Sequence, residues 1–235
     1  SDNIDPSEFV PSADINGDEM YNELMNIAEG FENAEIKSVV TAIYGDYKEK
    51  LVYWPAAFRL HHAIRGGLLY HTLSIVRLAQ SICRIYPSVN ADLLIAGAML
   101  HDIAKTDEFS VNDAGTATGY TLEGNLVGHL AKGAIIIDRY CEKLEISEDT
   151  KLLLEHMVLS HHGEPEFGAA VRPLFLEAEM LSQLDLMDAR VYEVEEAVGN
   201  AGAGEYTSRL WTLDNRKFYN HGRNEVSTAA RLLEK

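Results

Sequence analysis

The stretch LLIAGAMLHDIAK, Leu93–Lys105, places a histidine and an aspartate directly after an almost uninterrupted apolar run. The run predicts a buried helix over about residues 90–105. Burying Asp102 without a partner would be costly, so its carboxylate needs a cation or hydrogen-bond donors. Lys105 lies one helical turn further on and could pair with it. The stretch alone therefore leaves two interpretations open: a packed His101 beside an Asp102–Lys105 pair, or a metal-binding pair.

Four further histidines and one aspartate occur in similar apolar surroundings on other predicted helices. They are His71, His129, His161, His162 and Asp185. Each one alone is explained as readily by core packing or by a solvated face. Together with His101 and Asp102 they make seven, and neutral imidazole with carboxylate is a ligand set for Mn, Fe, Co, Ni or Zn. Seven such groups suffice for two metals that share a carboxylate.

The rest of the chain predicts an all-α protein with one helical core. Helical periodicity and capping residues indicate helices at 18–31, 33–47, 68–87, 90–105, 124–144, 148–162 and 173–198. Residues 107–123 interrupt this series and predict an inserted loop or short hairpin. We therefore expect a leader or linker at 1–17, a helical domain at 18–204 and a tail at 205–235 that packs on the domain.

The composition limits the possible partners. The 235 residues include 20 Lys and Arg against 37 Asp and Glu, a formal net charge of −17. This charge argues against binding nucleic acid through a broad basic face, so a phosphate substrate would need a locally positive site. No apolar run is long enough for a transmembrane span, and the first residues lack a secretory signal pattern. We expect a cytoplasmic protein whose two cysteines, Cys83 and Cys141, are free thiols.

The order His71, His101-Asp102, His129, His161-His162, Asp185 resembles the HD superfamily of metal-dependent phosphohydrolases over about residues 55–190. Several blocks are similar to the HD domain of YhaM-type 3′-5′ exoribonucleases in particular. They are Pro55–Ala57 with His61–Ala63, Gly66–Thr72, Gly124–His129, His161–Gly163 and Leu213–Tyr219. The resemblance implies an HD-domain helical bundle that holds one or two divalent metals.

The resemblance also implies roles for the seven residues. His71, His101, Asp102 and Asp185 match the ligands of a first metal. Asp102 would bridge to a second metal held by His129 and His161, with His162 beside it. Mn²⁺ or Fe²⁺ is favoured, and Co²⁺, Ni²⁺ or Zn²⁺ also suits these ligands. A water between the two metals would then attack phosphorus in line.

Two departures from related patterns narrow the expected chemistry. Gly67 stands where some relatives with three metals carry an acid, so a third metal is not expected. The His161-His162 doublet is followed by Gly163–Gly168 rather than the Gly-Tyr-Pro motif of cyclic-di-nucleotide phosphodiesterases, so such a substrate is not expected.

Four basic side chains are candidates for substrate contacts. Lys105 could touch a phosphate or leaving-group oxygen, with the alternatives of a salt bridge to Asp102 or a surface charge. Arg59, His62 and Arg65, just before His71, could bind further phosphates or could simply be solvated loop residues.

The expected function is metal-dependent hydrolysis of phosphodiester bonds in RNA or short oligonucleotides. The alternatives are hydrolysis of small nucleotides and a metal-stabilised signalling or scaffold domain with little turnover. YhaM-type enzymes carry an oligonucleotide-binding β-barrel before the HD domain, for which this sequence shows no strand pattern. We therefore expect either a fragment or a stand-alone HD protein, with long RNA bound only through an additional domain. The oligomeric state stays open.

Overall fold

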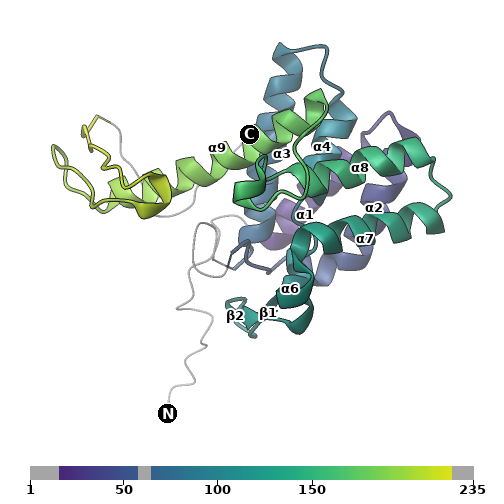
Figure 1. Ribbon diagram of the computed structural model, residues 1–235, viewed down its shortest axis with the longest axis horizontal. Coiled ribbons are helices and arrows are strands. Elements are labelled where there is room, and N and C mark those ends of the chain that lie inside the picture. The colour runs from purple at the N-terminus through teal and green to yellow at the C-terminus, as the bar shows by residue number, and fades with distance from the viewer. Residues whose placement is uncertain (1–15, 58–64, 224–235) are drawn as a thin grey trace.

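The computed structural model describes residues 16–57 and 65–223, and this part of the chain is a helical bundle with one small two-stranded sheet (Figure 1). The expectation of an all-α fold is confirmed. The longer helices are α1 Gly17–Glu29, α2 Ala34–Leu51, α3 Gly67–Ile85, α4 Ala91–Leu100, α7 Gly128–Lys143, α8 Glu148–Ser160 and α9 Leu176–Gly199. The short elements are α5 Lys105–Glu108, β1 Phe109–Val111, β2 Ala117–Tyr120, α6 Leu122–Leu126, and the 3₁₀ turns η2 Pro165–Phe167 and η3 Trp211–Leu213.

Helix α4 is the centre of the bundle. Every residue from Leu93 to Leu100 is buried, which explains why this helix is apolar on all sides rather than on one stripe. Helices α2, α3, α8 and α9 pack around it. The carboxyl end of α4 therefore opens into the middle of the molecule, where its neighbours can deliver side chains to one point.

Two glycines allow the helices near this point to approach closely. A Cβ atom on Gly97 of α4 would lie 2.2 Å from Met157 Cε of α8 and 3.2 Å from Leu181 Cδ2 of α9. A Cβ atom on Gly133 of α7 would lie 2.7 Å from Val158 Cγ1 of α8. The absence of a side chain at these positions brings α4, α7, α8 and α9 together.

The predicted helix 90–105 is too long, because α4 ends at Leu100. The next residues form turns in which Ile103 N donates to Leu100 O and Lys105 N to Asp102 O, before α5 begins. Such bonds between residues three apart rotate successive side chains differently from an α-helix. The prediction failed because the apolar run extends through the turn to Ile103 and Ala104, which are also buried.

The insertion between α5 and α6 is a hairpin, with Phe109 opposite Tyr120 and an irregularity between Ser110 and Val111. At its base Thr121 N donates to Glu108 O. The predicted helix 124–144 is in fact two helices, α6 and α7, because Gly128 has a φ of 74°. The predicted helix 173–198 begins later, at Leu176, so Pro173 lies before it.

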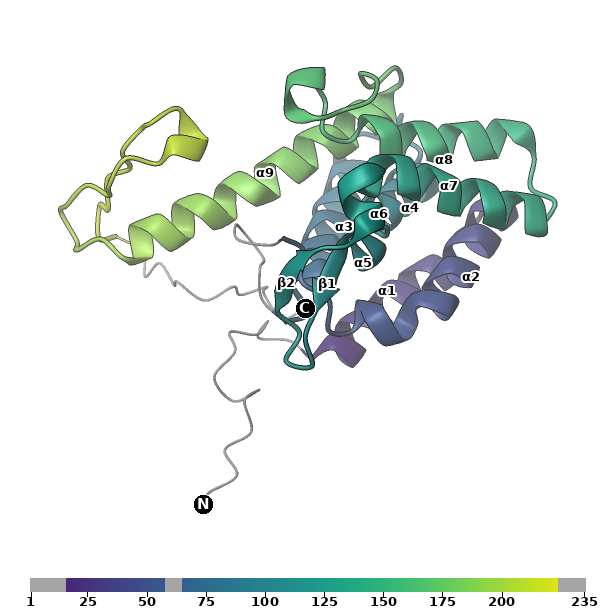
Figure 2. The same cartoon turned by 60° about the horizontal axis from the view of Figure 1, so that its bottom comes forward.

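Helix α9 extends well beyond the bundle, and residues 205–223 fold back along its outer end (Figures 1 and 2). Thr207 and Leu213 are the buried side chains of this tail segment. Residues 224–235 and the leader 1–15 lie outside the described residues, so the division of the chain into leader, domain and tail stays a prediction. None of the helices in the described part of the chain is both long and apolar enough to cross a membrane.

Candidate metal centre

All seven candidate metal ligands meet at one point in the bundle. His71 comes from α3, His101 and Asp102 from the turn after α4, His129 from the first turn of α7, His161 and His162 from the end of α8, and Asp185 from α9. His71, His101, Asp102 and His161 are buried. Elements that are more than 100 residues apart in sequence therefore supply one cluster of imidazoles and carboxylates.

The carboxylate of Asp102 lies between two groups of histidines. Its Oδ2 is 3.3 Å from His101 Nε2 and 3.7 Å from His71 Nε2. Its Oδ1 is 3.6 Å from His129 Nε2 and 3.7 Å from His161 Nε2. Each oxygen thus faces a different pair of imidazoles, which is the arrangement of a carboxylate able to bridge two cations.

Asp185 completes the first of these groups. Its Oδ1 lies 3.1 Å from His71 Nε2 and 3.9 Å from His101 Nε2. Two ligands bound to one metal at ~2.1 Å are roughly 3.0–3.4 Å apart at octahedral or tetrahedral angles. The separations in the first group match or slightly exceed this range, so the four residues can enclose one ion after small side-chain movements.

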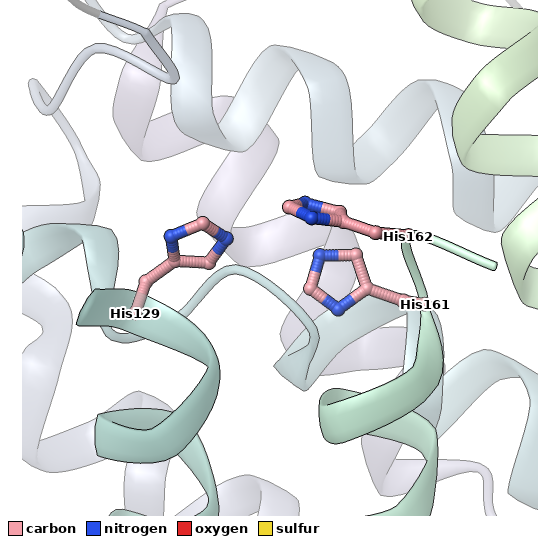
Figure 3. A group of neighbouring side chains, drawn as sticks. All are labelled: His129, His161 and His162. Carbon is pink, nitrogen blue, oxygen red and sulfur yellow. The ribbon is translucent and has the colours of Figure 1, made fainter. Parts of the chain in front are cut away.

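The second group consists of His129, His161 and His162. Figure 3 shows His129 on α7 facing the two histidines at the end of α8. Each of the three offers a ring nitrogen within 4.8 Å of the others. The ring centroid of His129 is 5.8 Å from that of His161 and 5.3 Å from that of His162. The three rings surround a space that a single ion could occupy.

The imidazoles are oriented by hydrogen bonds from their other nitrogens. His101 Nδ1 donates to Ala98 O at 2.9 Å, and His161 Nδ1 donates to Val158 O at 2.7 Å. Because a carbonyl oxygen can only accept, these bonds leave Nε2 of both rings with its lone pair toward the cluster. The tautomers of both histidines are therefore the ones that a metal ligand requires.

Two carboxylates that the sequence did not single out orient two further histidines. Asp188 Oδ2 is 2.7 Å from His71 Nδ1, and Ser74 Oγ donates to its other oxygen. Glu108 Oε1 is 3.1 Å from His129 Nδ1. Carboxylates in this position raise the basicity of a ligating imidazole. Asp188 follows Asp185 by three residues on α9, and this spacing is the one signal that could have identified it.

The cluster leaves buried polar atoms without partners, which tests whether a metal fits. Among the described residues, the buried side-chain atoms with no hydrogen-bond partner are Asp102 Oδ1, His129 Nε2, His161 Nε2 and His162 Nδ1. An unpaired buried polar atom costs about 1–3 kcal/mol. All four belong to the second group or to the carboxylate facing it, so a cation placed among them would satisfy four orphaned atoms at once.

The charges of the cluster suit cation binding. Burial would raise the pKa of Asp102, but the neighbouring Lys105 and His101 hold that pKa well below its usual range. Burial and the nearby His101 and His162 lower the pKa of His161. Burial likewise lowers the pKa of His162. At neutral pH the cluster therefore contains ionised carboxylate and two imidazoles with free lone pairs.

The pKa of His71 is shifted in the opposite direction to those of His161 and His162. Burial alone would lower its pKa, but its hydrogen bonds to Asp185 and Asp188 outweigh burial and raise the pKa to about 10. The imidazole then carries a proton at neutral pH when no metal is bound, and His71 would have to lose this proton from Nε2 before that nitrogen could bind a metal.

The four basic candidates for substrate contacts have different positions. Lys105 Nζ lies 2.6 Å from Asp102 Oδ2, and its side chain is 16% exposed, so it lies at the edge of the cluster. Arg65 is exposed and packs against the hairpin turn, where a Cβ atom on Gly115 would lie 2.8 Å from Arg65 Cγ. Arg59 and His62 lie outside the described residues. Both cysteines are free, as expected, and neither belongs to the groups of possible metal ligands in the described part of the chain.

Comparison with known protein families agrees with this geometry. Residues 68–190 match the family described as "HD domain", and this range contains all seven residues of the cluster. The chain therefore belongs to the HD domain family, which implies dependence on a divalent metal. No solved structure matches the chain.

The chain is also similar to individual curated proteins over almost its whole length. It is 40% identical over 219 residues to the 3′-5′ exoribonuclease YhaM of Listeria innocua, covering 93% of this chain and 69% of that protein. It is 36% identical, with the same coverage of both chains, to the protein of that name from Bacillus licheniformis. It is 38% identical to the one from Oceanobacillus iheyensis, covering 93% of this chain and 68% of the relative.

Proposed function

We propose that this chain is a metal-dependent phosphohydrolase that removes nucleotides from the 3′ end of RNA or short oligoribonucleotides. Its membership of the HD domain family and its similarity to proteins named 3′-5′ exoribonuclease support this activity. The observation that carries the proposal is the position of Asp102. Its two oxygens face two separate groups of imidazoles, and Asp102 Oδ1 and three of the ring nitrogens have no hydrogen-bond partner among the described residues.

The residues divide into two metal sites in this proposal. His71, His101, Asp102 and Asp185 would hold the first ion, and Asp102, His129, His161 and His162 the second. The set contains imidazole and carboxylate but no thiolate, which suits Mn²⁺ or Fe²⁺ and also admits Co²⁺, Ni²⁺ or Zn²⁺. When bound, such ions lower the pKa of water and stabilise negative charge on phosphate oxygens.

The chain's own side chains would contribute positioning and charge. Asp188 and Glu108 hold the rings of His71 and His129 in the orientation that ligation needs. Burial of the cluster weakens screening by water, so each charge acts more strongly on a bound phosphate. Lys105 lies at the edge of the cluster with a raised pKa, since the charge of Asp102 outweighs the effect of burial. We assign it to a phosphate or leaving-group oxygen.

The test uses the chain freed of metal with EDTA and then loaded with Mn²⁺. A 5′-labelled oligoribonucleotide, mononucleotides and bis-p-nitrophenyl phosphate are the substrates. We expect a ladder of shortened 5′-labelled products, which is the mark of removal from the 3′ end. Release of a labelled mononucleotide at the start of the reaction would contradict the direction, and turnover of mononucleotides alone would favour a nucleotide phosphohydrolase.

The matched variants are His101→Ala, within the cluster, and His156→Gln, in α8 outside it. His101→Ala should lose both bound metal and hydrolysis of all substrates, whereas His156→Gln should keep both. Full activity in His101→Ala would refute the assignment of this cluster as the active site.

A further inference from the structure

The tail contains an ordered hairpin at the outer end of α9, formed by residues 205–220 and called here the C-terminal hairpin. Tyr206 is paired with Tyr219 and Leu210 with Arg216, both antiparallel. The five residues between Leu210 and Arg216 include η3 and end in a tight turn, in which Arg216 N donates to Leu213 O. Asp214 and Asn215 are the central residues of this turn and both have positive φ, 57° and 55°. This hairpin includes the Leu213–Tyr219 block, which the metal centre does not use.

The charge of this part of the chain is opposite to that of the whole. Residues 205–223, the hairpin and the three residues after it, contain four basic side chains and two acidic ones, a net charge of +2, in a chain of net charge −17. The basic residues are Arg209, Arg216, Lys217 and Arg223, and all four are exposed. Within residues 16–57 and 65–223, Arg209, Lys217 and Arg223 form no ion pair. These cations are therefore available to an anionic ligand.

Exposed aromatic rings lie among these cations. Trp211 is 74% exposed, Tyr206 65% and Tyr219 50%. The rings of Tyr206 and Tyr219 are 5.1 Å apart, so their pair lies on one face of the hairpin. Lys217 is two residues before Tyr219 and therefore lies on the same face. Cations beside exposed aromatic rings are the combination with which proteins bind single-stranded nucleic acid, by stacking bases and neutralising phosphates.

The face of the C-terminal hairpin that carries Lys217 and Tyr219 is called here the outer face. We propose that this face binds single-stranded RNA on the 5′ side of the nucleotide that is removed. This inference rests on the proposed function. The metal centre and the hairpin are joined by one rigid element, since α9 carries Asp185 near the bundle and supports the hairpin at its outer end (Figure 2). From Asp185 to Asn200, α9 spans about 22 Å at ~1.5 Å per residue. A strand of several nucleotides is needed to reach both sites.

The pocket between the hairpin and α9 is unsuited to phosphate. It has a volume of about 670 Å³ and is lined by Glu193, Glu196 and Glu205, and also by Tyr206, Arg209 and Trp211 of the hairpin. Its carboxylates would repel phosphate, so the strand would lie outside the pocket, against Lys217, Tyr219 and the solvent-exposed parts of Tyr206 and Trp211.

The binding test uses the whole chain in EDTA, where no cleavage can occur, with a 12-nucleotide oligoribonucleotide. The chain has two tryptophans, and because Trp54 is buried, a change of fluorescence on adding RNA reports mainly on Trp211. We expect quenching in the wild type. Because Trp211→Ala removes this reporter, the affinities of all variants are compared by the fluorescence anisotropy of a 5′-labelled 12-mer, and we expect about tenfold weaker binding in Trp211→Ala and in Tyr219→Ala. Lys217→Ala should reduce the steepness of the plot of log K against the logarithm of salt concentration by about one. Tyr86→Ala, at another exposed tyrosine, is the control and should bind as the wild type.

A kinetic test separates this inference from the proposed function. In the Mn²⁺-loaded enzyme, Trp211→Ala should raise KM for the 12-mer about tenfold, while hydrolysis of bis-p-nitrophenyl phosphate stays unchanged. Wild-type RNA affinity in all three hairpin variants would overturn the inference. The inference would also be overturned if the hairpin variants sediment as smaller particles than the wild type but bind RNA equally well. The hairpin would then be a contact between copies of the chain. Failure of the wild type to hydrolyse any substrate would instead refute the proposed function and leave the binding test intact.

Discussion

Substitution of Gly97 by alanine should loosen the metal centre without touching any of its ligands. Gly97 lies one helical turn before His101 on α4, and the two side chains that its Cβ would meet lie one turn before His161 and Asp185. The crossing of α4, α8 and α9 therefore controls the spacing of three candidate ligands from three different helices.

The expected loss of stability in Gly97→Ala follows from the distances between the added Cβ atom and Met157. The added Cβ would lie 2.2 Å from Met157 Cε and 2.8 Å from Met157 Sδ. Ordinary contacts are ~3.5–4.0 Å, so the end of Met157 must retreat by more than about 1 Å. Met157 is fully buried, so overpacking should cost about 1–3 kcal/mol, against a gain of about 1 kcal/mol from replacing glycine in a helix. We expect a net loss of up to about 2 kcal/mol in the free energy of unfolding.

The assay combines urea unfolding with Mn²⁺-dependent hydrolysis of bis-p-nitrophenyl phosphate. We expect kcat/KM to fall by about tenfold to a hundredfold, since small displacements of catalytic groups have effects of this size. Gly45→Ala, in α2 with nothing within 4 Å of the added Cβ, should instead be stabilising by about 1 kcal/mol with unchanged activity.

A double-mutant cycle identifies the cause. In the Met157→Ala background the added methyl group has space, so Gly97→Ala should no longer be destabilising, which gives a coupling energy of about 1–3 kcal/mol. Wild-type activity and stability in Gly97→Ala would refute the reasoning that this close helix crossing sets the geometry of the centre.

Three further predictions concern metal binding and pH. Asp188→Asn should weaken Mn²⁺ binding about tenfold to a hundredfold in calorimetric titrations, because His71 loses its carboxylate partner, whereas Asp113→Asn in the exposed hairpin turn should bind normally. Mn²⁺ at 100 times its Kd should add about 2.7 kcal/mol per site to the free energy of unfolding and raise Tm by about 5–10 °C. EDTA should reverse this shift, and an unchanged Tm would contradict a buried metal site. Burial lowers the pKa of His156, and the neutral ring accepts a hydrogen bond from Leu174 N at Nε2. The neutral His156 ring therefore stabilises the fold above about pH 6.5, and this stabilisation is lost as the pH falls through the lowered pKa. The wild type should therefore lose more stability than His156→Gln between pH 7.5 and pH 5 in urea unfolding, and equal losses would contradict this sign.

The sequence predicts the helical fold because its evidence is local. The apolar run of α4 and the caps at Asn33 and Asn90, whose side chains accept from the third residue of each helix, are visible without tertiary information. The predicted helix ends are wrong where a tertiary contact determines the local structure. The apolar residues Ile103 and Ala104 continue the helical pattern, yet the chain turns there so that Asp102 enters the cluster.

The candidate site was predictable only in part, for a related reason. A histidine or aspartate in an apolar run is unusual enough to be noticed, and the structure brings all seven of these residues together. Asp188 and Glu108 lie in sequence surroundings typical of a solvated helix face. They are identified only when the fold places their carboxylates against His71 and His129. The cations of the tail are scattered in a chain of net charge −17, and their grouping depends on the hairpin.

The number of metal ions bound per chain tests the central claim most directly. Elemental analysis of the Mn²⁺-loaded protein should find two ions in the wild type and one in His129→Ala. In Asp102→Ala, which removes the carboxylate shared by both groups, it should find none or nearly none. Two ions retained in Asp102→Ala would contradict an account in which this carboxylate joins two metal sites.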